Sequence, residues 1–154
     1  MAVGPRELDE RELMGWGRRL GRIAAEHAVF AALSGPLGAG KTTLVQAACA
    51  GAETLEPATS PTFTLVSRYA APGGPIYHVD LYRIRDPGEL VELGWDDLAS
   101  GEHPVWVEWA ERAGPFLPAD RWDIRLSIPE GGRTRIVTAE PVGRAPRVPD
   151  PESV

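Results

Sequence analysis

The sequence predicts an α/β protein in which helices flank a mostly parallel central sheet with an antiparallel hairpin at one edge. Three observations support this prediction. An apolar run at 29–33 leads through a glycine-rich segment into a helical segment, the order of a strand, a turn and a helix. Further apolar segments are separated by helix signals, as expected for strands joined by crossovers. The last two strand-like segments flank Gly131-Gly132, which favours a hairpin.

The glycine-rich segment at 35–42 reads Gly-Pro-Leu-Gly-Ala-Gly-Lys-Thr and fits the phosphate-loop pattern G-x-x-x-x-G-K-[ST]. It lies between the strand predicted at 29–33 and a helix predicted at 43–48, which is the context that this motif requires. Glycines let the backbone close around an anion, and the following helix adds unsatisfied N–H donors and a positive dipole. The predicted fold class is therefore that of a P-loop NTPase.

Two side chains of this loop have separate roles in phosphate binding. Lys41 reaches the β- and γ-phosphates, and the Thr42 hydroxyl is a ligand for Mg²⁺. Lys41 is the only lysine among the 16 basic residues, and a compact ammonium fits between phosphate oxygens better than a guanidinium does. The residues predicted to surround the phosphates are Gly35, Leu37, Gly38, Ala39, Gly40, Lys41, Thr42 and Thr43.

Composition narrows the range of partners and compartments. The 154 residues suffice for one domain with a real core, and the net charge of −6 argues against a general polyanion-binding surface. The single cysteine, Cys49, excludes an internal disulfide framework and a multi-cysteine metal site. Neither a signal peptide nor an apolar run of membrane-spanning length is evident, so we expect a soluble, cytoplasmic protein without a membrane partner.

The segments on either side of the loop supply one helix and two strands. A helix is predicted at 6–26 because apolar residues recur there at helical spacing: Leu8, Leu13, Leu20, Ile23 and Ala24. The composition at 51–61 indicates a loop. Segments 62–69 and 76–82 are rich in β-branched and aromatic residues, and we expect each to form a strand.

A short helix is predicted at 87–93 from its terminal residues. Asp86 is a suitable N-cap, Pro87 occupies the first helical position, and Gly94 ends the helix. The residues at 95–98 are expected to form a second short helical turn.

The remainder of the chain is predicted to complete the sheet. Strands are expected at 104–109, 122–128 and 133–139, the last two forming the hairpin. From Pro141 onward prolines dominate and apolar residues become sparse. We therefore expect one P-loop NTPase domain at 1–140 and a proline-rich disordered tail at 141–154.

Two acidic residues end strands and are candidates for the same site. Asp80 lies at the end of the apolar run in the strand predicted at 76–82, and Glu108 lies near the end of the strand at 104–109. Ligands of open α/β sheets lie at the carboxyl ends of the strands, so both acids and the loop are expected along one rim. Either acid can hold magnesium or orient the attacking water, and the sequence leaves this division of labour open.

Weaker candidates lie elsewhere. Thr62, where a loop meets a strand, is either a switch residue that senses the γ-phosphate or metal, or a structural strand threonine. Trp109 either packs or contacts the ligand, and Arg133 either approaches the nucleotide or is an ordinary hairpin arginine. The histidines lack metal-ligand spacing, and packing or exposure is expected for each: His27, His78 and His103.

Several classes of phosphate-loop protein remain to be separated. A regulatory GTPase is not expected, because the chain has no asparagine for an Asn-Lys-x-Asp motif and its only glutamine, Gln46, lies in the loop helix. A small-molecule kinase remains an alternative, with Arg83 and Arg85 as candidate lid residues although no lid-like insertion is evident. A nucleotide-dependent binding module is a third possibility.

Four segments together resemble the TsaE (YjeE) family, the bacterial ATPase of tRNA threonylcarbamoyladenosine synthesis. They occur in the order and spacing of that family and are the loop at 35–43, Ser60-Pro61-Thr62-Phe63-Thr64-Leu65, His78-Val79-Asp80-Leu81-Tyr82-Arg83 and Val107-Glu108-Trp109. The loop is generic, whereas the second and third segments are specific to the family. The resemblance covers about residues 30–140.

The resemblance implies that the chain binds and hydrolyses ATP, with Mg²⁺ held by Thr42 and Glu108. It implies that Asp80 lies beside the phosphates, that Thr62 belongs to a switch-like segment and that Arg133 lies near the nucleotide. The catalytic residues would then be Lys41, Asp80 and Glu108.

The resemblance also implies partners. The chain would act with the paired TsaB- and TsaD-type proteins, one of which transfers the threonylcarbamoyl group to adenosine 37 of tRNA. ATP turnover, slow in the isolated chain, would reset this complex between cycles. Contact with tRNA would be indirect, which agrees with the acidic net charge of −6.

Overall fold

A single seven-stranded sheet forms the centre of the molecule in the computed structural model, which describes residues 2–59 and 65–151. The strands lie in the order β1-β7-β6-β2-β5-β4-β3. Their bounds are β1 Val3–Leu8, β2 Phe30–Ser34, β3 Val66–Tyr69, β4 Ile76–Asp80, β5 Val105–Glu108, β6 Arg121–Ser127 and β7 Arg135–Val142. The four central strands β4, β5, β2 and β6 are parallel. The prediction of an α/β protein with a sheet flanked by helices is confirmed.

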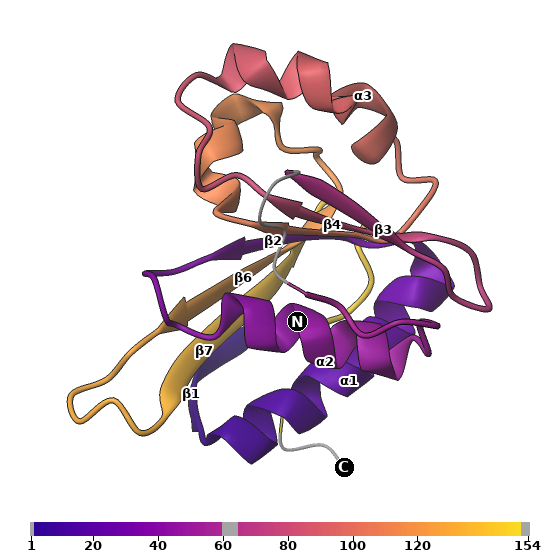
Figure 1. Ribbon diagram of the computed structural model, residues 1–154. Coiled ribbons are helices and arrows are strands. Elements are labelled where there is room, and N and C mark those ends of the chain that lie inside the picture. The colour runs from indigo at the N-terminus through magenta and orange to yellow at the C-terminus, as the bar shows by residue number, and fades with distance from the viewer. Residues whose placement is uncertain (1, 60–64, 152–154) are drawn as a thin grey trace.

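Helices cover both faces of this sheet (Figure 1). The helices α1 (Glu10–His27) and α2 (Lys41–Gly51) lie together on one face. The 3₁₀ helix η1 (Pro87–Leu93), the short α3 (Trp95–Leu98) and the 3₁₀ segment η2 (Ala110–Phe116) lie on the other. Each face has its own apolar core, because alternate residues of β2 and β5 point to opposite sides. Among the described residues, no helix combines the length and apolar character needed to cross a bilayer.

The amino-terminal segment differs from the prediction of one helix at 6–26. The helix begins only at Glu10, after a capping box formed by Asp9 and Glu12, and β1 precedes it. This strand pairs with β7 in antiparallel orientation, so the two partners come from opposite ends of the chain. Only Val3 and Leu8 of β1 are buried, and this sparse apolar pattern did not distinguish an edge strand from a helical turn.

The other elements lie close to their predicted positions. The N-cap Asp86, Pro87 in the first turn and the left-handed Gly94 bound η1 as predicted, although the turns between them are of the 3₁₀ type. Strands β6 and β7 pair in antiparallel orientation, and β7 lies between β6 and β1 instead of at the edge. The opposite edge of the sheet is β3, which pairs with β4 in antiparallel orientation. It corresponds to the strand predicted at 62–69, whose first three residues lie outside the described residues.

The segment after β7 differs from the prediction of a disordered tail at 141–154. Strand β7 itself extends to Val142, and the following residues to 151 return across the sheet and α1. The indole N–H groups of Trp16 and Trp122 donate to the carbonyls of Pro149 and Pro146, each at 2.8 Å, and Val148 is 2% exposed. The composition of the segment did not predict this order. The segment contributes the acceptors, which are backbone carbonyls of prolines, whereas the two indole donors lie elsewhere in the chain.

Candidate functional site

The glycine-rich loop connects the carboxyl end of β2 to the first turn of α2. Gly35, Gly38 and Gly40 all have positive φ, at 144°, 80° and 101°. A Cβ on Gly35 would lie 2.3 Å from the carbonyl oxygen of Leu126 in β6, so only glycine allows this approach. No side chain caps α2 at Gly40 and its first turn carries no acid, so its N–H groups are available to an anion.

Lys41 is folded back over this loop. Its Nζ donates hydrogen bonds to the carbonyls of Gly35 at 2.5 Å and Pro36 at 3.0 Å, and the side chain is buried. The ammonium also lies 4.0 Å from the centroid of the Trp109 ring. Desolvation lowers the pKa of Lys41, and the neighbouring acids, Glu108 first among them, oppose this shift. The loop thus places a desolvated cation beside its backbone amides.

A chain of hydrogen bonds joins α2, β5 and β4 beside the loop. The Thr42 hydroxyl donates to Oε1 of Glu108 at 2.8 Å, and Nε2 of His78 lies 2.6 Å from Oε2 of the same carboxylate. Glu108 is 3% exposed and His78 is fully buried. Glu108 is therefore fixed at both oxygens, one of them next to the predicted metal ligand Thr42.

The register of the sheet explains why these residues meet. Parallel pairing aligns Asp80 of β4 with Glu108 of β5, and His78 with Trp106. Residues two apart in a strand share a face, so all four lie on the face that α2 covers. The prediction that the loop, Asp80 and Glu108 share one rim of the sheet agrees with this register.

Asp80 lies next to this chain but points toward its own turn. Its Oδ1 accepts a hydrogen bond from the backbone N–H of Tyr82 at 2.9 Å, and the residue is half-buried. Burial, followed by repulsion from Glu108, raises the pKa of Asp80, although the Tyr82 hydrogen bond and Lys41 oppose the shift. The fold therefore disfavours the ionised form of the Asp80 carboxyl group beside the loop.

We expect Asp80→Asn to stabilise the nucleotide-free protein at neutral pH. A raised pKa in the folded state favours the protonated form, so stability conferred by protonation is lost as the pH rises through that pKa. The gain in free energy of unfolding from Asp80→Asn should thus be largest near pH 7.5 and shrink as the pH falls toward about 4. Urea unfolding at several pH values measures it, with Asp96→Asn, the loss of an exposed carboxyl on α3, as control. A pH-independent gain would contradict the expectation.

Trp109 follows β5 in the left-handed conformation, with φ of 57°. Its ring lies 5.1 Å from the ring of Tyr82, and the Arg112 guanidinium lies 5.6 Å from the centroid of each. Within this pair, it is the Trp109 ring that covers the ammonium of Lys41. A left-handed conformation is unusual for a bulky residue and directs the ring over the loop.

The arginine that contacts the loop is Arg135. Its Nη2 donates to the carbonyl of Gly38 at 3.1 Å, and its Nη1 donates to the carbonyls of Gly132 and Thr134. For Arg133, the predicted residue, no such contact with the loop is seen. Arg133 lies between β6 and β7, whereas Arg135 is the first residue of β7. In the strand predicted at 133–139 both arginines lie on one face, so sequence alone did not separate them.

The structure thus brings together Lys41, Thr42 and Glu108, with Asp80 beside them. Leu37 is 74% exposed at the tip of the loop, and Gly38 is exposed as well. Thr62 lies outside the described residues. The sequence alone gave no site role to His78 or Arg135, although His78 begins the family-specific segment at 78–83 and lies two residues before Asp80.

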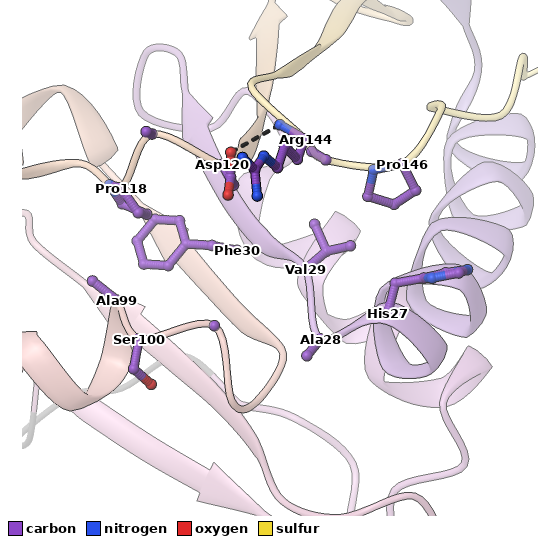
Figure 2. A pocket seen from close by; sticks show the side chains of 13 residues that line it. His27, Ala28, Val29, Phe30, Ala99, Ser100, Pro118, Asp120, Arg144 and Pro146 are labelled. Carbon is purple, nitrogen blue, oxygen red and sulfur yellow. Dashed lines mark hydrogen bonds between the residues drawn. The ribbon is translucent and has the colours of Figure 1, made fainter.

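A separate pocket of about 360 Å³ lies at the opposite, amino-terminal end of the strands. Figure 2 shows His27 and Phe30 on its walls, with Asp120 and Arg144 joined by a hydrogen bond. In that bond the backbone N–H of Arg144 donates to Oδ1 of Asp120 at 2.8 Å. Phe30 begins β2 whereas the loop follows its end, so this pocket is not part of the site described above.

Comparison with known proteins decides the family. The family model described as threonylcarbamoyl adenosine biosynthesis protein TsaE matches residues 8–136. The chain belongs to the TsaE family. That family's tRNA threonylcarbamoyladenosine biosynthesis protein TsaE from Haemophilus influenzae is 38% identical over 114 residues, which are 71% of this chain and 72% of that protein.

Other relatives agree with this assignment. The TsaE protein of Nostoc sp. is 37% identical over 135 residues, 84% of this chain and 82% of that protein. The TsaE protein of Mycobacterium bovis is 40% identical over 131 residues, 79% and 77% of the two chains. The crystal structure of YdiB from Bacillus subtilis is similar at a TM-score of 0.65 and 28% identity, covering 92% of this chain and 88% of that chain.

Proposed function

We propose that this TsaE-family chain binds ATP and Mg²⁺ at the loop between β2 and α2 and hydrolyses the ATP for tRNA threonylcarbamoyladenosine biosynthesis. Family membership gives the chain its role in that pathway. The single observation that supports the ATPase chemistry is the contact between Thr42 and Glu108 at the mouth of a loop that also holds Lys41.

The Thr42 and Glu108 pair fits the requirements of magnesium. Their oxygens lie 2.8 Å apart, and two neighbouring ligands of an octahedral Mg²⁺ at 2.0–2.1 Å are about 2.9 Å apart. Both residues offer hard oxygen ligands. For both oxygens to face one ion, only the Thr42 hydroxyl hydrogen must rotate away from Glu108. Among the described residues no group of three acidic, histidine or cysteine side chains forms a metal site. Such a sparse protein shell is usual for magnesium, which retains waters and binds substrate phosphates.

Each remaining residue has a role in this proposal. The loop amides and the first turn of α2 receive the phosphates, and Lys41 exchanges the carbonyls of Gly35 and Pro36 for phosphate oxygens. Thr42 and Glu108 would hold Mg²⁺, which would supply positive charge against the charge that develops on the phosphates. Asp80 lies beside the phosphates and orients the attacking water, because Glu108 is already committed to Thr42 and His78.

The proposed partners are the paired TsaB- and TsaD-type proteins, with tRNA reached through them in the cytoplasm. The net charge of −6 supports indirect contact, since tRNA binding requires neutralisation of many phosphates. Turnover by the isolated chain is expected to be slow, with the partners completing the catalytic arrangement.

ATP turnover by the chain alone, with the partner pair and with small-molecule acceptors tests this function. We expect slow basal release of ADP that the partner pair increases, and tRNA modification over many cycles only with intact ATP turnover. Release of ADP that requires a small alcohol or nucleotide acceptor would instead make the chain a kinase. Unchanged multi-cycle modification without hydrolysis would leave it a nucleotide-dependent binding module.

A further inference from the structure

His78 is fully buried on β4, beneath the proposed metal site. We propose that His78 is a positioning residue that holds the Glu108 carboxylate by Oε2, so that Oε1 is presented to Thr42 and the metal. The inference rests on the proposed function, because it concerns the metal ligand of that site. It assigns to His78 no contact with ATP or magnesium.

The two contacts of the Glu108 carboxylate indicate how the imidazole of His78 acts on it. Nε2 lies 2.6 Å from Oε2 of Glu108, which is within the range of a strong hydrogen bond. The terminal torsion of a glutamate is broad, so a single contact from Thr42 to Oε1 leaves the carboxylate plane free to rotate. A second contact at Oε2 removes that freedom. Outer hydrogen bonds of this kind orient metal-ligating carboxylates.

The surroundings of the second ring nitrogen indicate which tautomer His78 adopts. Nδ1 of His78 is buried and has no hydrogen-bonding partner among the described residues. A buried N–H without a partner costs about 1–3 kcal/mol, so the hydrogen is assigned to Nε2, where the carboxylate accepts it. The imidazole is then a donor to Glu108 alone.

Packing by itself does not explain a histidine at this position. Neighbouring positions on the same face are apolar: Ile76 precedes it by two residues and Trp106 is its partner in β5, and both are buried in the core beside α2. An apolar side chain would fill the same place without an unpaired nitrogen. In the part of the chain that the structure describes, the polar contact that compensates for burying His78 is the contact with Glu108.

Two amide substitutions separate positioning from packing. His78→Gln places an amide N–H close to the position of Nε2, whereas the shorter His78→Asn carries the same group but does not reach Glu108. His78→Phe also removes the donor but fills the space, and it repeats the comparison if the asparagine variant does not fold. Ile76→Val is the matched control, since it perturbs the same face of β4 without touching the carboxylate.

The readout is metal affinity, measured apart from turnover. Paramagnetic resonance of free Mn²⁺, which like Mg²⁺ prefers oxygen ligands, gives its affinity for the chain with bound ADP, and a fluorescent ADP analogue without metal gives nucleotide affinity. We expect Mn²⁺ affinity to fall about 10- to 100-fold in His78→Asn. His78→Gln and Ile76→Val should stay within about threefold of wild type, with metal-free ADP affinity unchanged in all.

Results that contradict the positioning role of His78 differ from results that contradict the proposed function. Wild-type Mn²⁺ affinity in His78→Asn, or equal losses in His78→Asn and His78→Gln, would overturn the positioning role and leave the proposed function standing. Failure of the wild-type chain to bind Mn²⁺ with ADP, or binding that is insensitive to Glu108→Gln, would overturn the proposed function and this inference together.

Discussion

Replacement of Lys41 by alanine is expected to weaken ATP and ADP binding by about 100-fold. Hydrogen bonds from a charged donor contribute about 1.5–3 kcal/mol each, and a tenfold change in affinity corresponds to about 1.4 kcal/mol. Lys41 is the only lysine, and the loop around it contains no other cation that could replace it. Arg135 already donates its hydrogen bonds to backbone carbonyls, one of them in the loop.

The same substitution should leave the fold intact. Within residues 2–59 and 65–151, Lys41 donates to the carbonyls of Gly35 and Pro36, and removal of a desolvated ammonium offsets the loss of these bonds. We expect the free energy of unfolding to change by less than about 1 kcal/mol. Titration of a fluorescent ATP analogue with parallel urea unfolding measures both quantities. Arg22→Ala removes an exposed positive charge from α1 and is the control. Wild-type nucleotide affinity in Lys41→Ala would contradict a phosphate-binding role for the loop.

Replacement of Glu108 by glutamine is expected to reduce ATP turnover by about 100-fold or more. Loss of a metal-ligating carboxylate removes several kcal/mol of charge stabilisation in the transition state, and each 1.36 kcal/mol is a factor of ten in rate. Glutamine keeps the shape of the side chain and an oxygen that accepts from His78. The buried chain of contacts between α2, β5 and β4 should therefore persist.

Binding measurements separate this effect from unfolding. Metal-free ADP affinity of Glu108→Gln should remain within about twofold of wild type, because the loop amides and Lys41 are unchanged. Turnover at saturating ATP and magnesium, with the partner pair present, is the measured rate. Glu92→Gln makes the same chemical change at an exposed position of η1 and should turn over as wild type does. Full turnover by Glu108→Gln would exclude the carboxylate as a metal ligand.

The features that the sequence predicts well are those formed by residues close together in the chain. The glycines and Lys41 of the loop lie within one turn, and the N-cap Asp86 with the terminal Gly94 bounds η1 without help from elsewhere. Asp80 and Glu108 were found for a similar reason, since each ends its own apolar strand.

The features that escaped prediction depend on pairing between distant segments. The contact of His78 with Glu108 requires the register of β4 on β5, which no local pattern specifies. Strand β1 requires β7 as its partner. The segment after Val142 is ordered by hydrogen bonds from two buried tryptophans, and the sequence does not show which carbonyl each indole N–H contacts. Arg135 was not singled out because the strand predicted at 133–139 places it on the same face as Arg133, whereas β7 begins only at Arg135.

A crystal of the chain grown with Mn²⁺ and a non-hydrolysable ATP analogue tests most directly whether Thr42 and Glu108 share one metal ion. Anomalous scattering locates the manganese independently of the protein atoms. We expect one ion bound by the Thr42 hydroxyl, by Oε1 of Glu108 and by phosphate oxygens, with Lys41 turned from the carbonyls of Gly35 and Pro36 to the phosphates. An ion bound elsewhere, or phosphates outside the loop while Thr42 and Glu108 keep their 2.8 Å contact, would contradict this arrangement.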